Sequence, residues 1–133
     1  MADATLEQVV TALRTRILSQ SAVTNLIGTR LYLVDAGENP PTPYAIYTPD
    51  ILDISKSHDG QGGFQTFQVE VEVFDKSSVG AMRVAQAILD AIKNFAGTVN
   101  DTFINRVILS GQSSSRNAKG NLFGQFLDFT VYV

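Results

Sequence analysis

The sequence predicts an α+β fold: a mainly antiparallel sheet of about five strands with two amphipathic helices packed on one face. Two segments carry apolar residues at helical spacing. The strand-like segments come in consecutive runs rather than alternating strictly with helices, which favours α+β over a parallel α/β sheet. Residues Phe67–Val73 alternate apolar and polar side chains, as in an antiparallel strand with one buried and one solvated face.

The first helix is predicted over about residues 6–19. Thr5 and Gln8 have the spacing of a capping box, in which each side chain satisfies a free backbone N–H of the other residue. A stripe of apolar residues follows at helical spacing: Leu6, Val9, Val10, Leu13 and Ile17. A short helical turn over residues 21–28 comes next, and we expect Gly28 to end it in the left-handed conformation.

Two strands are predicted around a proline-rich loop. Residues 30–34 form a short strand, and residues 35–43 form a loop because its prolines remove backbone donors. Residues 44–48 resume as a strand that can continue to Ile54. Pro49 indicates an edge or a bulge at that point.

The second helix is expected to begin at Ser77 or Ser78 and to end at Gly97. Its predicted buried stripe consists of Met82, Ala85, Leu89, Ile92 and Phe95, widened by Val84, Ile88 and Ala96. Residues 107–109 form a strand, and residues 126–133 form the last one. That last strand is nearly apolar on both faces, so we expect it to be central in the sheet or covered by a partner.

Two polar, glycine-containing segments are long for hairpin connections, and both are predicted to be mobile docking loops: residues 55–64 and 111–122. The candidate interface residues on them are Ser57, His58, Asp59, Gly60, Gln61, Ser113, Ser114, Arg116, Asn117 and Lys119. The hypothesis is that they become ordered on contact with a partner.

The bulk composition excludes several classes of protein. A length of 133 residues with 44% hydrophobic content suits a single folded domain, 1–133. A net charge of −3 argues against a protein that grips nucleic acid with a basic stripe. No cysteine is present for a disulfide or thiolate metal site. No signal peptide and no apolar run of roughly 20 residues is found, so a soluble cytoplasmic product is expected.

No set of residues predicts catalysis. His58 stands beside Asp59 in a glycine-rich loop, but no serine stands in a strand-turn-helix elbow to complete a triad. Glu70 and Glu72 share one face of a strand without a His or Asp at ligand spacing. The glycines of residues 60–63 lack the lysine and the helix of a phosphate loop. We therefore expect a protein without catalytic, cofactor-binding or metal-binding residues that is not an enzyme.

Taken in order, the segments resemble the tail-completion family of tailed phages. The resemblance is carried by the N-terminal helix, the apolar turn and Arg-Leu-Tyr strand start of residues 21–32, and Pro43-Tyr44-Ala45-Ile46-Tyr47. It continues with the alternating strand ending at Asp75, the alanine-rich helix around residues 84–88 and the final strand over residues 126–131. No single motif is specific, but the ordered set spans nearly the whole chain. The serine-rich segment 111–120 is longer than the family pattern.

This resemblance implies a virion assembly protein at the head-proximal end of the tail, assembled in the host cytoplasm. It implies a homo-oligomeric ring, a hexamer, that contacts the tail tube protein and a head-completion or connector protein, with no membrane partner. DNA would pass through the lumen as a passenger, in agreement with the net negative charge of the chain. Three alternatives stay open: another neck or tube subunit, a small enzyme, and a host binding module.

Overall fold

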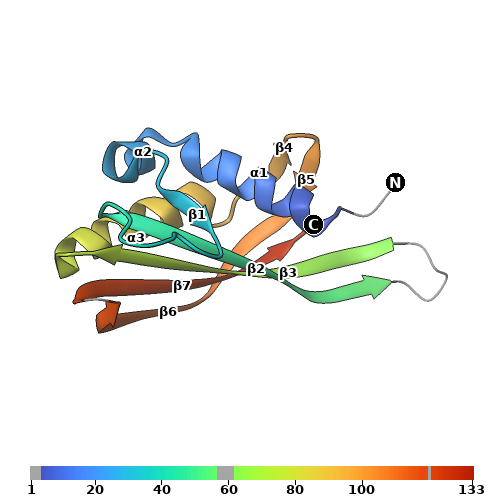
Figure 1. Cartoon of the computed structure of the whole chain (residues 1–133). Coiled ribbons are helices and arrows are strands. Elements are labelled where there is room, and N and C mark those ends of the chain that lie inside the picture. Colours follow the sequence, from blue (N-terminus) through green and yellow to red (C-terminus); the bar gives the residue numbers. More distant parts are fainter. Residues whose placement is uncertain (1–3, 57–61, 120) are drawn as a thin grey trace.

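The computed structural model describes residues 4–56, 62–119 and 121–133. Within these residues, three helices lie on one face of a five-stranded sheet (Figure 1). The helices are α1 (Leu6–Leu18), α2 (Ser21–Ile27) and α3 (Ser78–Ile92). The strands of the sheet are β1 (Leu31–Leu33), β2 (Tyr44–Lys56), β3 (Gly62–Asp75), β6 (Arg106–Lys119) and β7 (Leu122–Tyr132). A separate hairpin consists of β4 (Gly97–Val99) and β5 (Thr102–Ile104).

The sheet has the order β1-β2-β3-β7-β6. Strand β1 pairs in parallel with β2, and every other pairing in the described sheet is antiparallel. The predicted α+β class is therefore confirmed, with the expected short helical turn present as α2. The last strand, β7, lies between β3 and β6, as its apolar character on both faces predicted.

Helix α1 begins where the sequence predicted. The Gln8 N–H donates to Thr5 Oγ1 over 3.1 Å, and the Thr5 N–H donates to Gln8 Oε1 over 2.8 Å, which completes the capping box. The stripe that follows is buried against the sheet: Val9, Val10, Ala12, Leu13 and Ile17. Gly28 ends α2 as predicted and has a positive φ of 60°, but its ψ of −123° lies outside the left-handed helical region that was expected, in a conformation open to glycine.

Helix α3 begins at the predicted place but ends earlier than predicted. The Ser77 side chain accepts a hydrogen bond from the Gly80 N–H over 3.1 Å and caps the first turn. The prediction that Gly97 ends the helix is wrong, because α3 stops at Ile92 and Asn94 takes the left-handed conformation with φ of 60°. The Asn94 N–H then donates to the carbonyl of Val107, which turns the chain toward β6.

The predicted buried stripe of α3 is wrong at Met82, which is 51% exposed, and at Ala96, which is exposed and lies beyond the end of the helix. The buried face instead consists of Ala81, Val84, Ala85, Ile88, Leu89, Ala91 and Ile92. Helix α3 packs against α1, α2, β3 and β7 together, so a wide arc of it is covered. The uncovered strip contains Val79 and Met82.

Gly80 stands in the first turn of α3 directly against a carboxylate. A Cβ placed on Gly80 would collide with Asp75 Oδ2.

Glycine-to-alanine changes in exposed helices ordinarily stabilise by about 1 kcal/mol. At this position we expect Gly80→Ala to lower the melting temperature instead, because the short Asp75 side chain must leave its bond to the Lys76 N–H. Thermal unfolding of Gly80→Ala and of Gly80→Ala combined with Asp75→Ala tests this, since the double variant should recover the loss. A single variant that melts above the wild type would contradict the collision.

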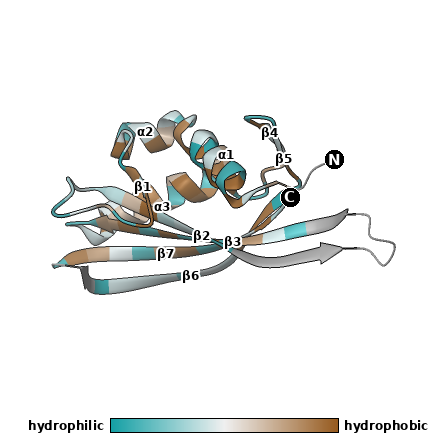
Figure 2. Ribbon diagram, turned by 45° about the vertical axis from the view of Figure 1, so that its right-hand side comes forward, coloured by the Kyte–Doolittle hydropathy of each residue, from teal (hydrophilic) through white to brown (hydrophobic). Residues whose placement is uncertain are grey.

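The main core fills the space between the helices and the sheet, where the apolar residues gather (Figure 2). A second, smaller core lies on the opposite, helix-free face of the sheet. It consists of buried Tyr44, Ile46 and Phe74, with Tyr32, Ala36, Leu122 and Phe126 packed around them. Its aromatic rings form a chain, with centroid distances of 6.1 Å for Tyr32–Tyr44, 5.3 Å for Tyr44–Phe74 and 6.2 Å for Phe74–Phe126.

Pro49 lies on an uncovered edge, as predicted. The Ala45 N–H donates to the Arg30 carbonyl and the Val34 N–H donates to the Tyr47 carbonyl, so the main-chain groups of Ala45 and Tyr47 face β1. Pro49 is the next residue in that alternation and lies past the last residue that pairs with β1. No neighbouring strand needs a hydrogen bond from Pro49, so its missing N–H costs the sheet nothing.

Candidate interface site

The predicted docking residues fall into two groups in the structure. Residues Ser57, His58, Asp59, Gly60 and Gln61 lie outside the described residues. The flanking residues 55–56 and 62–64 belong to β2 and β3, so the first predicted loop is shorter than expected. The second group, residues 113–119, lies on β6.

The prediction of a mobile docking loop over residues 111–122 is wrong for residues 111–119, which continue the edge strand β6, and for Leu122, which begins β7. Gly111 pairs with Asp128, Ser113 with Phe126 and Ser115 with Gly124. Ser113, Ser114 and Arg116 are exposed on this strand. Asn117 and Lys119 are further along it, and their interface role stays a prediction.

Backbone pairing holds this polar segment in place. Strand β7 supplies backbone partners for residues 111–115 and again for Lys119, and side-chain hydrogen bonds add to this pairing. The Gln125 amide donates to Ser114 Oγ over 2.7 Å, and Ser110 Oγ donates to the Asp128 carbonyl over 3.0 Å. The missed signal is the Gly120-Asn121 pair, which separates Lys119 from its partner Leu122 by two residues. A two-residue connection of this type indicates a hairpin.

Three carboxylates gather on the helix-free face of the sheet, here called the acidic face: Glu70 and Glu72 of β3 and Asp128 of β7. Val69, Val71 and Val73 point into the main core, so the alternate residues Glu70 and Glu72 point to the opposite side. Glu70 is directly opposite Asp128 in the antiparallel register. Like charges in opposite positions repel each other across a sheet. The predicted common face of Glu70 and Glu72 is thus confirmed, and the topology adds Asp128.

The acidic face raises the pKa of Glu70 above its ordinary value. Desolvation at the sheet surface is the first cause, although the side chain is exposed. The charge of Glu72, a hydrogen bond with Glu72 and the charge of Asp128 add to it. Burial, together with the charges of Glu72 and Tyr32, also raises the pKa of Tyr44.

Neutralising Glu70 should stabilise the fold at neutral pH. A carboxyl whose pKa is raised in the folded state binds its proton more tightly there, so stability falls as pH rises from 4.5, the ordinary value, through the raised pKa. We expect Glu70→Gln to melt higher than the wild type at pH 7.5, by roughly 1–3 °C for a surface charge. The gain should vanish at pH 4. Melting curves at both pH values measure it, with Glu38→Gln in an exposed loop as the control. An equal gain at both pH values would show that the ionisation of Glu70 is not the cause.

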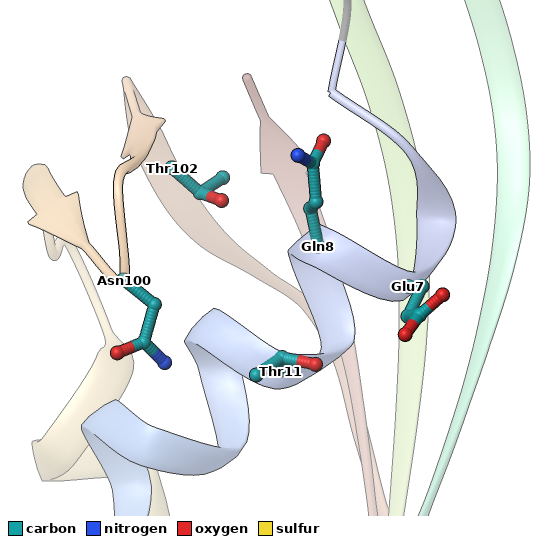
Figure 3. Close-up of a pocket in the computed structure, with 5 residues that line it drawn as sticks. All are labelled: Glu7, Gln8, Thr11, Asn100 and Thr102. Atoms are coloured by element: carbon teal, nitrogen blue, oxygen red, sulfur yellow. The ribbon is translucent and has the colours of Figure 1, made fainter.

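A small cleft lies between α1 and the β4–β5 hairpin (Figure 3). It is lined by Glu7, Gln8, Thr11, Asn100 and Thr102 and has a volume of about 130 Å³. Asn100 and Asp101 form the hairpin turn with φ of 49° and 64°, and the Asn100 amide donates to Thr15 Oγ1 over 2.8 Å. The cleft is well below the roughly 300 Å³ at which small-molecule sites begin. Sequence reasoning missed this hairpin because its strands have only three residues each.

Within the described residues, no three His, Cys, Asp or Glu side chains are arranged as metal ligands. None of the described helices is long and apolar enough to cross a bilayer. The acidic face and the uncovered strand edges are therefore the candidate interface features of the described residues.

Comparison with known proteins identifies the class. The sequence model of a family described as "Tail completion protein gp17" matches residues 11–133, which is nearly the whole chain. The class is that of structural proteins of phage-type tails. The chain belongs to the tail completion protein gp17 family, as the resemblance in the sequence indicated.

A structural comparison agrees on the fold. A chain of a solved structure described as "Virion of native gene transfer agent (GTA) particle" is similar to this chain, with a TM-score of 0.75. The two are 19% identical, and the similarity covers 92% of each chain. A comparison with curated proteins finds no match.

Proposed function

We propose that this protein completes the tail as a homo-oligomeric ring, a hexamer, at its head-proximal end. The ring stops polymerisation of the tube protein and presents a surface to a head-completion or connector protein. The single observation that carries this proposal is the family match over residues 11–133. In this role the protein is a non-enzymatic structural part, 1–133 acts as one domain, and DNA passes through the lumen.

The acidic face is suited to the wall of such a lumen. Glu70, Glu72 and Asp128 give this face of the sheet a cluster of carboxylates, with Thr48 and Thr130 beside them in the register. Carboxylates repel phosphates, whereas each cation that neutralises a phosphate adds affinity. DNA would thus slide past this wall without being held. Placing the helices on the outside of the ring leaves this face turned inward.

Electron microscopy of tails assembled with and without the protein tests the proposal. We expect its omission to give over-long tails, or tails that do not attach to heads, and its addition to restore attachment. Tails of normal length that join heads without it would overturn the proposal and favour a different role in the particle.

A further inference from the structure

Strand β1 ends in a strained turn. The Asp35 N–H donates to the Leu33 carbonyl over 2.7 Å, which closes a three-residue γ-turn around Val34. Val34 has a φ of 67°, and a γ-turn with a positive φ at its middle residue is rare and strained. A β-branched residue is especially unsuited to this conformation. The Val34 side chain is 60% exposed, so its own packing does little to stabilise the turn.

This turn lies where the chain leaves the sheet edge for the helix-free face. Because β1 and β2 are parallel, the chain must return along the sheet before β2 begins. It does so over residues 35–43, here called the strap. Ala36 of the strap packs against the second core, whose buried members are Tyr44, Ile46 and Phe74. The strap therefore crosses over one end of that core.

The two ends of the strap are held differently. Ala36 is the one half-buried residue among residues 35–39, and the other four are exposed. At the far end the strap is fixed by a hydrogen bond, in which Arg30 Nε donates to the Pro43 carbonyl over 2.9 Å. The strain at Val34 and the contact of Ala36 thus act against each other at the same end of the strap.

We propose that the strap is a lid with two positions. In the closed position, which the structure shows, Ala36 contacts the second core and Val34 is strained. In the open position the bond from the Asp35 N–H is broken, Val34 takes a negative φ, and the side of the second core under the strap meets solvent. Backbone strain changes such an equilibrium by roughly 5–150-fold, and here it favours opening. The lid belongs to the single subunit and is independent of the proposed ring.

Two substitutions should shift this equilibrium in opposite directions. Val34→Gly relieves the strain of the closed position, because glycine takes a positive φ without steric cost, and we expect the open population to fall by roughly fivefold. Ala36→Gly removes the methyl group that packs against the second core, so the open population should rise by roughly two- to fourfold.

Leu33→Gly and Glu38→Gly are the matched controls. Leu33 is a neighbouring apolar residue that is 49% exposed and belongs to β1, so glycine relieves no strain there. Glu38 is an exposed strap residue, so Glu38→Gly adds backbone freedom without removing a contact with the second core. Melting temperatures establish that all four variants are folded.

Fluorine NMR of protein labelled with 3-fluorotyrosine measures the two positions. The chain has four tyrosines, of which Tyr32 and Tyr44 belong to the second core. Tyr132 lies at the far end of β7 and serves as the internal reference. Opening in microseconds to milliseconds gives relaxation dispersion at Tyr44, whereas slower opening gives two signals and faster opening gives one averaged signal.

We expect the Tyr44 signal to shift toward the closed position in Val34→Gly and toward the open position in Ala36→Gly, with the Tyr132 signal unchanged. A Tyr44 signal without dispersion, splitting or opposite shifts in these two variants would overturn the lid. Equal effects of Leu33→Gly and Val34→Gly, or of Glu38→Gly and Ala36→Gly, would overturn it as well. A lid that moves as expected in a protein that forms no ring would leave this inference standing without the proposed function.

Discussion

Replacing Phe74 by alanine is expected to lower the free energy of unfolding by about 3–5 kcal/mol. Phe74 is 4% exposed and is the ring that links Tyr44 to Phe126 in the second core. Truncation removes these contacts and leaves a cavity between the sheet and the segment around Ala36. A domain of this size is stable by about 5–15 kcal/mol in total, so the loss is a large part of it.

Urea unfolding of Phe74→Ala measures this effect. Phe103→Ala makes the same chemical change at a side chain that is 52% exposed on the β4–β5 hairpin. We expect the control to change stability by no more than about 0.5 kcal/mol. Equal losses in the two variants would mean that the second core does not hold the helix-free face together.

Reversing the charge of the acidic face should slow the passage of DNA. In the double variant Glu70→Lys with Glu72→Lys, each subunit of the proposed ring directs two cations to the lumen. Cations that contact phosphates release counterions, and a protein making 6–10 such contacts changes its DNA affinity by about 10³–10⁵ between 50 and 200 mM salt. We therefore expect DNA ejection to be much slower than in the wild type at low salt and to recover at high salt.

Time-resolved dye fluorescence of ejected DNA at the two salt concentrations measures this effect. The variant Glu70→Gln with Glu72→Gln is the control, because it removes the carboxylates without adding a cation. It should eject DNA nearly as fast as the wild type. Normal, salt-independent ejection by the lysine variant would show that the acidic face does not line the path of DNA.

Features that depend on near neighbours in the chain could be predicted from the sequence. The capping box of Thr5 and Gln8 needs only four consecutive residues, and it is present as expected. The alternation of residues 67–73 fixes which side chains share a face, so the common face of Glu70 and Glu72 followed from their spacing. Pro49 identified an edge because a missing N–H is a local property.

Features set by distant segments could not be predicted. The exposure of Met82 depends on how α1, α2 and the sheet surround α3, which the periodicity of one helix does not encode. The segment 111–119 has a loop-like composition, and it is a strand because β7 supplies a ladder of backbone partners. Asp128 joins Glu70 only because β3 and β7 are neighbours in the sheet.

The position of β7 also affects the order of events during synthesis. Strands β3 and β6 have no common neighbour until residues 122–132 have left the ribosome, because β7 pairs with both. The contacts of β3 with β7 join segments far apart in sequence, which makes folding slow relative to helical proteins. Strand β6 therefore joins the sheet only after residues 122–132 have emerged, and the sheet is completed last at this edge.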